Sequence, residues 1–210
     1  MSFVEVLVEG AADVPVVKEL LERYFGLSAG PDFRIIPHQG KGSLPGNPLA
    51  RPEPHRRGLL DQLPAKLRGY AHLPPDFAIV VLVDADSDDC RRLKSDLVAM
   101  LAALPACPPT VLFRIAVEET ESWFLAQPDA VAAAYPRADV RKLAGIQPDA
   151  VVGAWERLTY AIGQKKPEQC TGADKHEWAT RIAPYLNFDV PISPSLSALV
   201  EGLKRVVPVP

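Results

Sequence analysis

The sequence contains the stretch DFAIVVLVDADSDDC, which spans Asp76–Cys90. Its apolar run, Phe77–Val83, has no polar alternation, which is typical of a strand buried on both faces of a parallel sheet. The run is followed directly by Asp84, Asp86 and Asp88. Ligands of open α/β sheets bind beside the carboxyl ends of the strands. We therefore expect a central strand that directs these three carboxylates into a ligand site.

A cluster of acids at this place has two interpretations. Clusters of side chains that offer only oxygen atoms as ligands suit Mg²⁺, Mn²⁺ or Ca²⁺, so the first interpretation is a metal site. Asp and Ser are also common N-caps, and a helical pattern begins near Arg91, so Ser87, Asp88 or Asp89 could be only a cap. A cap does not explain Asp84 and Asp86, which come earlier in the chain.

The composition is that of a globular chain. It has 210 residues, of which 48% are hydrophobic, enough for one large domain or for one domain with a smaller appendage. Lys and Arg number 23 and Asp and Glu number 26, so the net charge is −3. This balance gives no global signal for nucleic acid, and any such contact would have to come from a local patch.

The sequence has three cysteines, Cys90, Cys107 and Cys170, which are widely spaced and form no CxxC pair. This spacing argues against a disulfide framework and against a zinc site. The N-terminus lacks a basic segment followed by an apolar core, and no apolar run is long enough to span a bilayer. We expect a cytoplasmic protein without a membrane partner.

The N-terminal segment predicts a strand, a sharp turn and a helix. The strand Phe3–Val8 ends at Glu9 and Gly10, and a helical pattern follows Asp13. Gly10 allows the backbone to turn where the strand stops. Asp13 fits either an N-cap or a ligand. Glu9, a carboxylate at the end of an apolar strand, is placed for ligand binding.

A second strand, Phe33–Pro37, leads into a basic loop. The loop contains Gly40-Lys41-Gly42, a flexible turn that fits either a phosphate contact or a solvated loop. His38 also follows the strand, and Arg56 and Arg57 lie further along. We expect the loop to contact substrate.

A fourth strand, Thr110–Val117, runs into three more acids, Glu118, Glu119 and Glu121. Acids in a first helical turn complement the helix dipole, which is one explanation for them. Glu118 and Glu121 would also lie one turn apart and point the same way. Trp123 follows in an apolar context, and we expect its ring to be buried.

The alternation of strands and helices predicts an α/β fold with a parallel sheet of about four strands flanked by helices. We assign residues 1–127 to this α/β domain and residues 128–210 to a helical C-terminal region packed on it. The helical region contains Lys175, which fits either a phosphate contact or a solvated surface lysine.

The order of these motifs resembles a Toprim domain, the Rossmann-like fold of topoisomerases, bacterial primases, small ribonuclease maturases and overcoming-lysogenization-defect (OLD) nucleases. The matching pieces are Val8–Gly10 with Asp13, and Val83–Asp86. The Glu-Gly-x-x-Asp form is closer to the OLD-type nucleases than to the topoisomerases. The stretch Glu118–Ala126, together with the helical C-terminal region, resembles the small Toprim-like proteins of domain-of-unknown-function family 4276.

The resemblance implies that Glu9, Asp84 and Asp86 are catalytic and hold Mg²⁺ or Mn²⁺, with Glu9 as acid/base. It also implies a second metal position that uses Asp13 and one glutamate after the fourth strand. The predicted metal ligands are Glu9, Asp13, Asp84, Asp86, Asp88, Glu119 and Glu121. The predicted substrate contacts are Gly10, His38, Lys41, Arg56, Arg57 and Lys175.

The resulting hypothesis is a metal-dependent nuclease or phosphodiesterase that acts on nucleic acid. No ATPase is evident in the sequence, and related families are often encoded beside a separate ATPase in phage-defence loci, so the resemblance implies such a partner. A nucleotide-sugar transferase with a DxD motif is an alternative, but it gives Glu9 and Asp13 no role. A non-catalytic Toprim-like regulator also stays open, as does a homodimer.

Overall fold

The computed structural model describes residues 3–190 and 193–207. Its single sheet has four strands in the order β2-β1-β3-β4, and every pair of neighbours is parallel. The expected parallel sheet is therefore confirmed, with the predicted buried strand in its interior. The strands are β1 (Phe3–Val8), β2 (Phe33–Pro37), β3 (Phe77–Asp84) and β4 (Thr110–Ala116).

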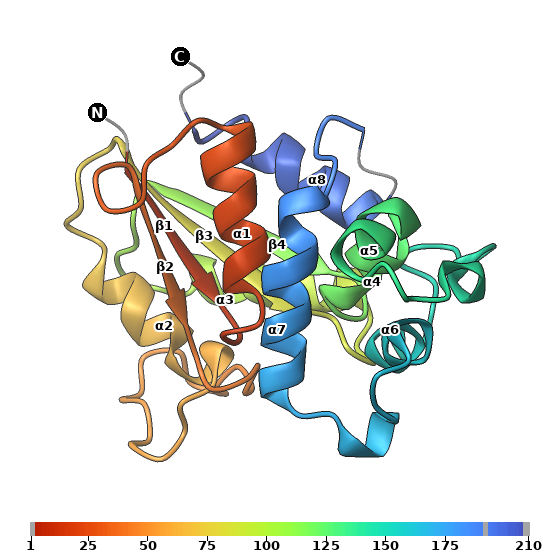
Figure 1. Ribbon diagram of the computed structural model, residues 1–210. Coiled ribbons are helices and arrows are strands. Elements are labelled where there is room, and N and C mark those ends of the chain that lie inside the picture. Colours follow the sequence, from red (N-terminus) through yellow and green to blue (C-terminus); the bar gives the residue numbers. More distant parts are fainter. Residues whose placement is uncertain (1–2, 191–192, 208–210) are drawn as a thin grey trace.

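Helices cover both faces of this sheet (Figure 1). The helices are α1 (Val14–Glu19), which continues as a π-helical turn over Leu20–Tyr24, then α2 (Leu59–Gly69), α3 (Cys90–Ala102), α4 (Glu121–Leu125), α5 (Pro128–Ala134), α6 (Ala154–Ile162), α7 (Gly172–Ile182) and α8 (Pro194–Leu203). None of the helices in the described residues is long and apolar enough to cross a bilayer.

Alternate side chains of β3 belong to two separate cores. Val80 and Leu82 pack with α1 and with helices α4 to α8. Ile79, Val81 and Val83 pack with α2 and α3 on the opposite face. This double burial explains why the central strand is a continuous apolar run with no polar alternation.

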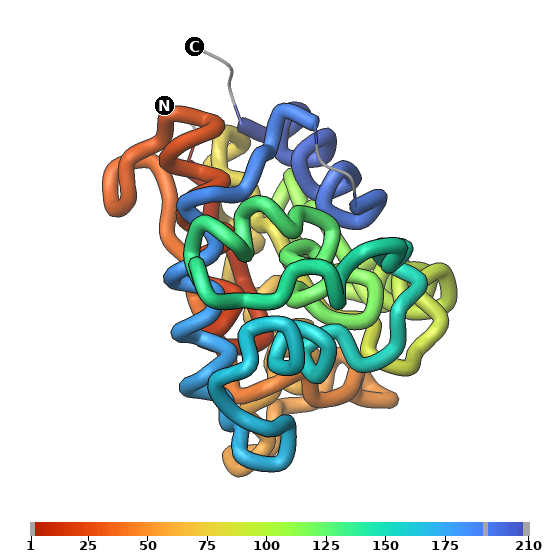
Figure 2. The backbone as a smooth tube through the Cα atoms, turned by 45° about the vertical axis from the view of Figure 1, so that its right-hand side comes forward, coloured from red at the N-terminus to blue at the C-terminus, as the bar shows by residue number. Residues whose placement is uncertain are grey.

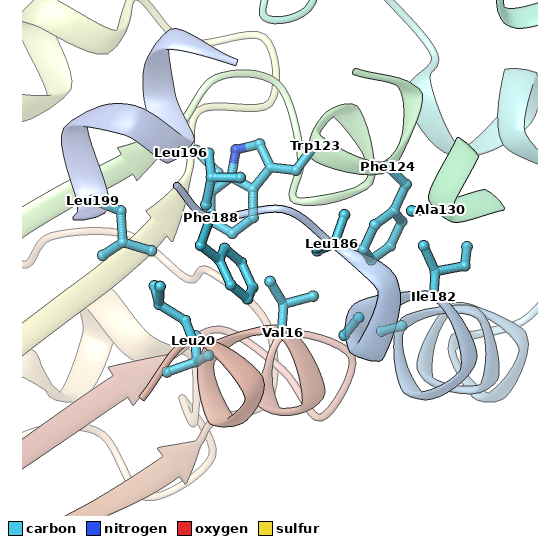
Figure 3. Packing of buried hydrophobic residues seen from close by; sticks show 14 of the residues in the cluster. Val16, Leu20, Trp123, Phe124, Ala130, Ile182, Leu186, Phe188, Leu196 and Leu199 are labelled. Atoms are coloured by element: carbon cyan, nitrogen blue, oxygen red, sulfur yellow. The ribbon is translucent and has the colours of Figure 1, made fainter. Parts of the chain in front are cut away.

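The C-terminal helices share the first of these cores with the sheet. Trp123 of α4 lies beside Leu196 of α8, and the cluster continues to Val16 of α1 and to Leu20 of the π-helical turn (Figure 3). Figure 2 shows α7, in blue, running alongside the red N-terminal segment. Residues after 128 thus complete the core of one sheet face, which fixes the position of α7 relative to the strand ends.

One predicted helix starts later than expected. The apolar spacing of residues 149–162 in the sequence predicts one helix over that range, but α6 begins at Ala154 because both Asp149 (φ 63°) and Gly153 (φ 76°) are left-handed. The Asp149 side chain instead accepts a 2.8 Å hydrogen bond from the Ser193 hydroxyl at the start of α8. The acid serves a helix distant in sequence, which local periodicity could not reveal.

Replacing Trp123 with alanine should destabilise the protein by about 3–5 kcal/mol, because the ring is fully buried and leaves a cavity. The indole also donates a 2.8 Å hydrogen bond to the Ser195 hydroxyl. Urea unfolding measures the change. Tyr185→Ala, at a ring that is 54% exposed, is the control and should cost less than about 0.5 kcal/mol. Equal losses in the two variants would contradict a core role for Trp123.

Candidate functional site

Carboxylates from separate elements meet at the carboxyl edge of the sheet. Glu9 follows β1, and its Oε1 accepts a 2.8 Å hydrogen bond from the backbone N–H of Asp84, the last residue of β3. The parallel register that pairs Leu7 with Val81 brings these two strand ends together. The sheet therefore unites two of the three residues predicted to be catalytic.

Asp13 occupies the N-cap position of α1, but its buried side chain joins this edge of the sheet and does not cap the helix. It directly precedes α1 but makes no side-chain capping bond to that helix. Its carboxylate accepts hydrogen bonds from the Gly10 N–H (3.0 Å) and from the Thr120 hydroxyl (3.0 Å). Asp13 thus ties the turn after β1 to the segment after β4, and Gly10 contributes its backbone to the same link.

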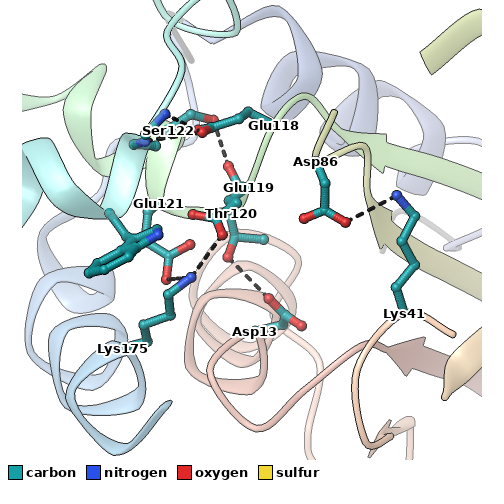
Figure 4. Close-up of polar contacts among 12 residues, drawn as sticks. Asp13, Lys41, Asp86, Glu118, Glu119, Thr120, Glu121, Ser122 and Lys175 are labelled. Carbon is teal, nitrogen blue, oxygen red and sulfur yellow. Dashed lines mark hydrogen bonds and ion pairs between the residues drawn. The ribbon is translucent and has the colours of Figure 1, made fainter. Parts of the chain in front are cut away.

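Lys41 approaches the acids from one side (Figure 4). Its Nζ donates to the Ala85 carbonyl at 2.8 Å and lies 3.1 Å from Asp86 and 2.7 Å from Asp88. The side chains of Asp86 and Asp88 are exposed by about half, at 50% and 57%. Asp86 and Asp88, which were predicted to be metal ligands, are therefore both ion-paired with Lys41, which was predicted to contact substrate.

Two glycines hold the Lys41 loop against α2. A Cβ on Gly58 would lie 2.5 Å from the Gly42 Cα, so the two backbones can approach only without side chains. The carbonyls of Gly40 and Lys41 accept hydrogen bonds of 2.8 and 2.7 Å from Leu59 and Leu60 at the start of that helix. The turn is therefore fixed, and the position of Lys41 with it.

Lys175 of α7 approaches from the opposite side. Its Nζ lies 2.8 Å from Glu119 Oε1 and 3.7 Å from Glu121 Oε1, and 5.4 Å from the centre of the Trp155 ring. Only 26% of the lysine side chain is exposed. The solvated-lysine alternative is therefore wrong, and α7 supplies a largely buried cation to the acid cluster.

Glu118 does not point the same way as Glu121, and this expectation is wrong. Glu118 adopts a left-handed conformation (φ 64°), and its carboxylate accepts a 3.0 Å hydrogen bond from the Ala154 N–H at the start of α6. The turn instead places Glu119 with Glu121, beside Lys175. The Glu118 carbonyl accepts a 2.8 Å bond from Asp86 N–H, which joins the segments after β3 and β4.

Burial and mutual repulsion make the central carboxylates hard to ionise. Burial raises the pKa of Glu9 to about 8, with further increases from Asp86 and Asp13. Burial also raises the pKa of Asp84 well above its ordinary value, and the charges of Asp13 and Glu9 raise it further. Burial raises the pKa of Glu121 to about 7, although Lys175 opposes this rise. The edge needs positive charge to keep these acids ionised.

The donors suit Mg²⁺ or Mn²⁺ chemically, although they do not form a finished cage. In the described part of the chain, no three acidic, histidine or cysteine side chains are arranged to hold a metal ion. The candidate ligands offer only oxygen atoms, as these cations prefer, and Glu119 Oε2 is buried without a hydrogen-bond partner. The donor set fits, provided that side chains such as Asp86 turn inward from Lys41.

The remaining predicted contacts lie away from the acids or face other groups. The Nδ1 of His38 lies 2.9 Å from the Val8 carbonyl, and burial lowers its pKa. Arg56 pairs with Glu53 and Asp61. Arg57 lines a separate surface hollow together with His38.

Thr120, which binds Asp13, was not predicted from the sequence. The available signal was its position, because it is a hydroxyl residue flanked by Glu118, Glu119 and Glu121.

The raised pKa of Glu9 predicts a pH-dependent stability in the presence of a chelator. The ordinary value is 4.5 and the folded value about 8, so the folded state binds this proton more tightly. The resulting stability is present below about pH 4.5 and is lost as the pH rises through about 8. Glu9→Gln should make this loss shallower in urea unfolding across that range. The exposed control Glu168→Gln should keep the wild-type slope, and equal slopes in both variants would refute the prediction.

Comparison with known proteins supports the fold. No curated protein matches the sequence. The C-terminal region of the Burkholderia pseudomallei OLD protein is similar in structure, with a TM-score of 0.55, 14% identity and coverage of 98% of each chain. The expected Toprim-like α/β fold is thereby confirmed. The sequence pattern described as "Domain of unknown function (DUF4276)" matches residues 8–204, and the chain belongs to this family.

Proposed function

We propose that the protein is a divalent-metal-dependent phosphodiester hydrolase of the Toprim type, with nucleic acid as its substrate. One observation carries the proposal: carboxylates that follow β1, β3 and β4 meet at one edge of the sheet between two lysines, Lys41 and Lys175. A purely structural role for these acids would have to explain why the pKa values of Glu9, Asp84 and Glu121 are all raised at the same edge of the sheet. Perturbed carboxylates that converge in this way are typical of functional sites.

Each group has a role in this proposal. Glu9 and Asp84 would hold Mg²⁺ or Mn²⁺, with Asp13 and Glu119 nearest to any second ion. The bound ion would stabilise the charge that develops on the attacking and leaving oxygens of a phosphodiester. Glu9, with a pKa of about 8, is suited to accept or donate a proton near neutral pH. Lys41 would turn from Asp86 and Asp88 to neutralise a phosphate.

The partner in this proposal is a separately encoded ATPase, with the chain as the nuclease component of a phage-defence system. Its support is the fold shared with the C-terminal region of an OLD protein and the Glu-Gly-x-x-Asp motif. Co-purification from the native host, with and without ATP, tests the partner directly.

One observation favours a second candidate, a non-catalytic regulator. Lys41 and Lys175 already form ion pairs with four of the acids, Asp86, Asp88, Glu119 and Glu121. A cluster of acids that no longer binds a metal would need such lysines to neutralise its charge. The two candidates differ in whether a divalent ion can displace these ammonium groups.

Adding Mn²⁺ or Mg²⁺ should raise the melting temperature. An ion about 100-fold above its Kd should stabilise the fold by about 2.7 kcal/mol, or roughly 5–10 °C for a chain of this size. Differential scanning fluorimetry measures the shift. Asp84→Asn should abolish it, whereas the exposed control Asp189→Asn should retain it. A shift of the same size in both variants would show that the ion binds elsewhere.

The purified chain should cleave labelled DNA or RNA slowly, and faster with Mn²⁺ than with Mg²⁺. Asp84→Asn should reduce the single-turnover rate by about 100-fold or more, because a ligand of the reacting ion is lost. Asp189→Asn again serves as the control. Cleavage that survives the double change Asp84→Ala and Asp86→Ala would exclude this site. Metal binding without cleavage in the presence of the ATPase would favour the regulator.

A further inference from the structure

Four basic side chains from three elements gather in a groove outside the acid cluster. Arg91 and Lys94 come from one face of α3, Arg114 from β4, and Arg205 from the segment just after α8. The groove has a volume of about 470 Å³ and lies at β4, which is an edge strand of the described sheet. No single stretch of sequence contains more than two of these residues.

Arg114 is built into the floor of this groove. Its Nε donates to the Ala198 carbonyl of α8 at 2.7 Å, and its Nη1 donates to the Phe113 carbonyl at 2.7 Å. A Cβ on Gly202 would lie 2.2 Å from Nη2 of Arg114, so the guanidinium rests against α8 where that helix has no side chain. The cation is therefore held in place by the fold.

Positive charge exceeds negative charge among the side chains that line the groove, with four cations against the two acids Asp149 and Glu201. Across residues 3–190 and 193–207, none of the four cations has an ion-pair partner. The two acids that line the groove are engaged elsewhere: Asp149 accepts from Ser193 and Ser195, and Glu201 pairs with Lys204 at 2.8 Å.

Arg114 lies close enough to Lys94 and to Arg205 for the like charges to repel. Burial lowers the pKa of Arg114, and the charge of Arg205 lowers it further. Partial burial of the ammonium group lowers the pKa of Lys94, although the residue as a whole is exposed, and the charge of Arg114 lowers that pKa further. Like charges held together in this way favour the binding of an anion, which would relieve the repulsion.

The groove reaches the carboxyl edge of the sheet. Its lining includes Val117, which directly precedes Glu118, and Cys90, which lies two residues after Asp88. Cys90 and Pro194 are the first residues of α3 and α8, so the groove begins where these two helices start. A polymer with one phosphate at the acid cluster could continue along the groove.

We propose that this groove binds the phosphate backbone of a nucleic-acid strand, an inference that rests on the phosphodiesterase function proposed above. Arginines predominate among the four cations, and a guanidinium can bind two phosphate oxygens at once. The groove supplies positive surface that the net charge of −3 conceals.

The test measures binding of a fluorescein-labelled 20-nucleotide single-stranded DNA by anisotropy in EDTA, where no metal-dependent cleavage occurs. The combined variant Arg91→Ala, Lys94→Ala and Arg205→Ala should bind at least about 10-fold more weakly at low salt. The slope of log Kd against log salt should fall by about 2, at about 0.7 per lost phosphate contact. All three residues are exposed, so circular dichroism should be unchanged.

A matched control removes the same charge elsewhere, in the variant Arg137→Ala, Arg157→Ala and Lys166→Ala. These residues are also exposed, and their loss should weaken binding less than about 2-fold. Equal effects of the two triple variants, or no effect of the groove variant, would overturn the groove assignment. Polyglutamate of equal charge that competes as well as DNA would overturn the choice of nucleic acid.

Failure of the groove and failure of the proposed catalysis give different results. DNA bound through the groove by a protein that cleaves nothing would refute the hydrolase and leave the groove standing. Cleavage that depends on Asp84 but not on Arg91, Lys94 and Arg205 would refute the groove and leave the hydrolase standing.

Discussion

Repulsion among carboxylates at one edge of the sheet is the constraint on which the rest of this structure depends. Parallel strands all end at the same edge, so the acids that follow β1, β3 and β4 must lie together. Burial raises the pKa values of Glu9, Asp84 and Glu121, which shows how costly full ionisation is there. The fold must therefore bring positive charge and hydrogen-bond donors to this edge.

Two lysines meet this requirement, and each explains a part of the architecture. Lys41 stands on a loop that is fixed by the close approach of Gly42 and Gly58. Lys175 stands on α7, which packs against α1 and shares the core around Trp123. The C-terminal helical region thus does more than cover the sheet, because it holds a cation over Glu119 and Glu121.

Sequence patterns predicted the features that depend on local periodicity and chain order. The apolar run Phe77–Val83 identified the doubly buried strand, and the alternation of elements predicted the parallel sheet. Side-chain partners were harder to predict. A left-handed φ at Glu118 decided which glutamates face Lys175, and the Asp13–Thr120 contact joins residues 107 positions apart. Contacts of that range depend on packing that no local pattern encodes.

Net charge is a weak guide to ligand class in this molecule for the same reason. The value of −3 averages the acidic carboxyl edge of the sheet and the basic groove that lies beside β4. Charges are screened beyond about 8 Å at physiological salt, so a bound phosphate responds to the nearest groups and hardly to the total. Arg114 shows how the fold creates such a local field, since its position depends on the missing side chain at Gly202. The separation of the two charged regions is thus a property of the tertiary structure, which brings α3, β4 and α8 together.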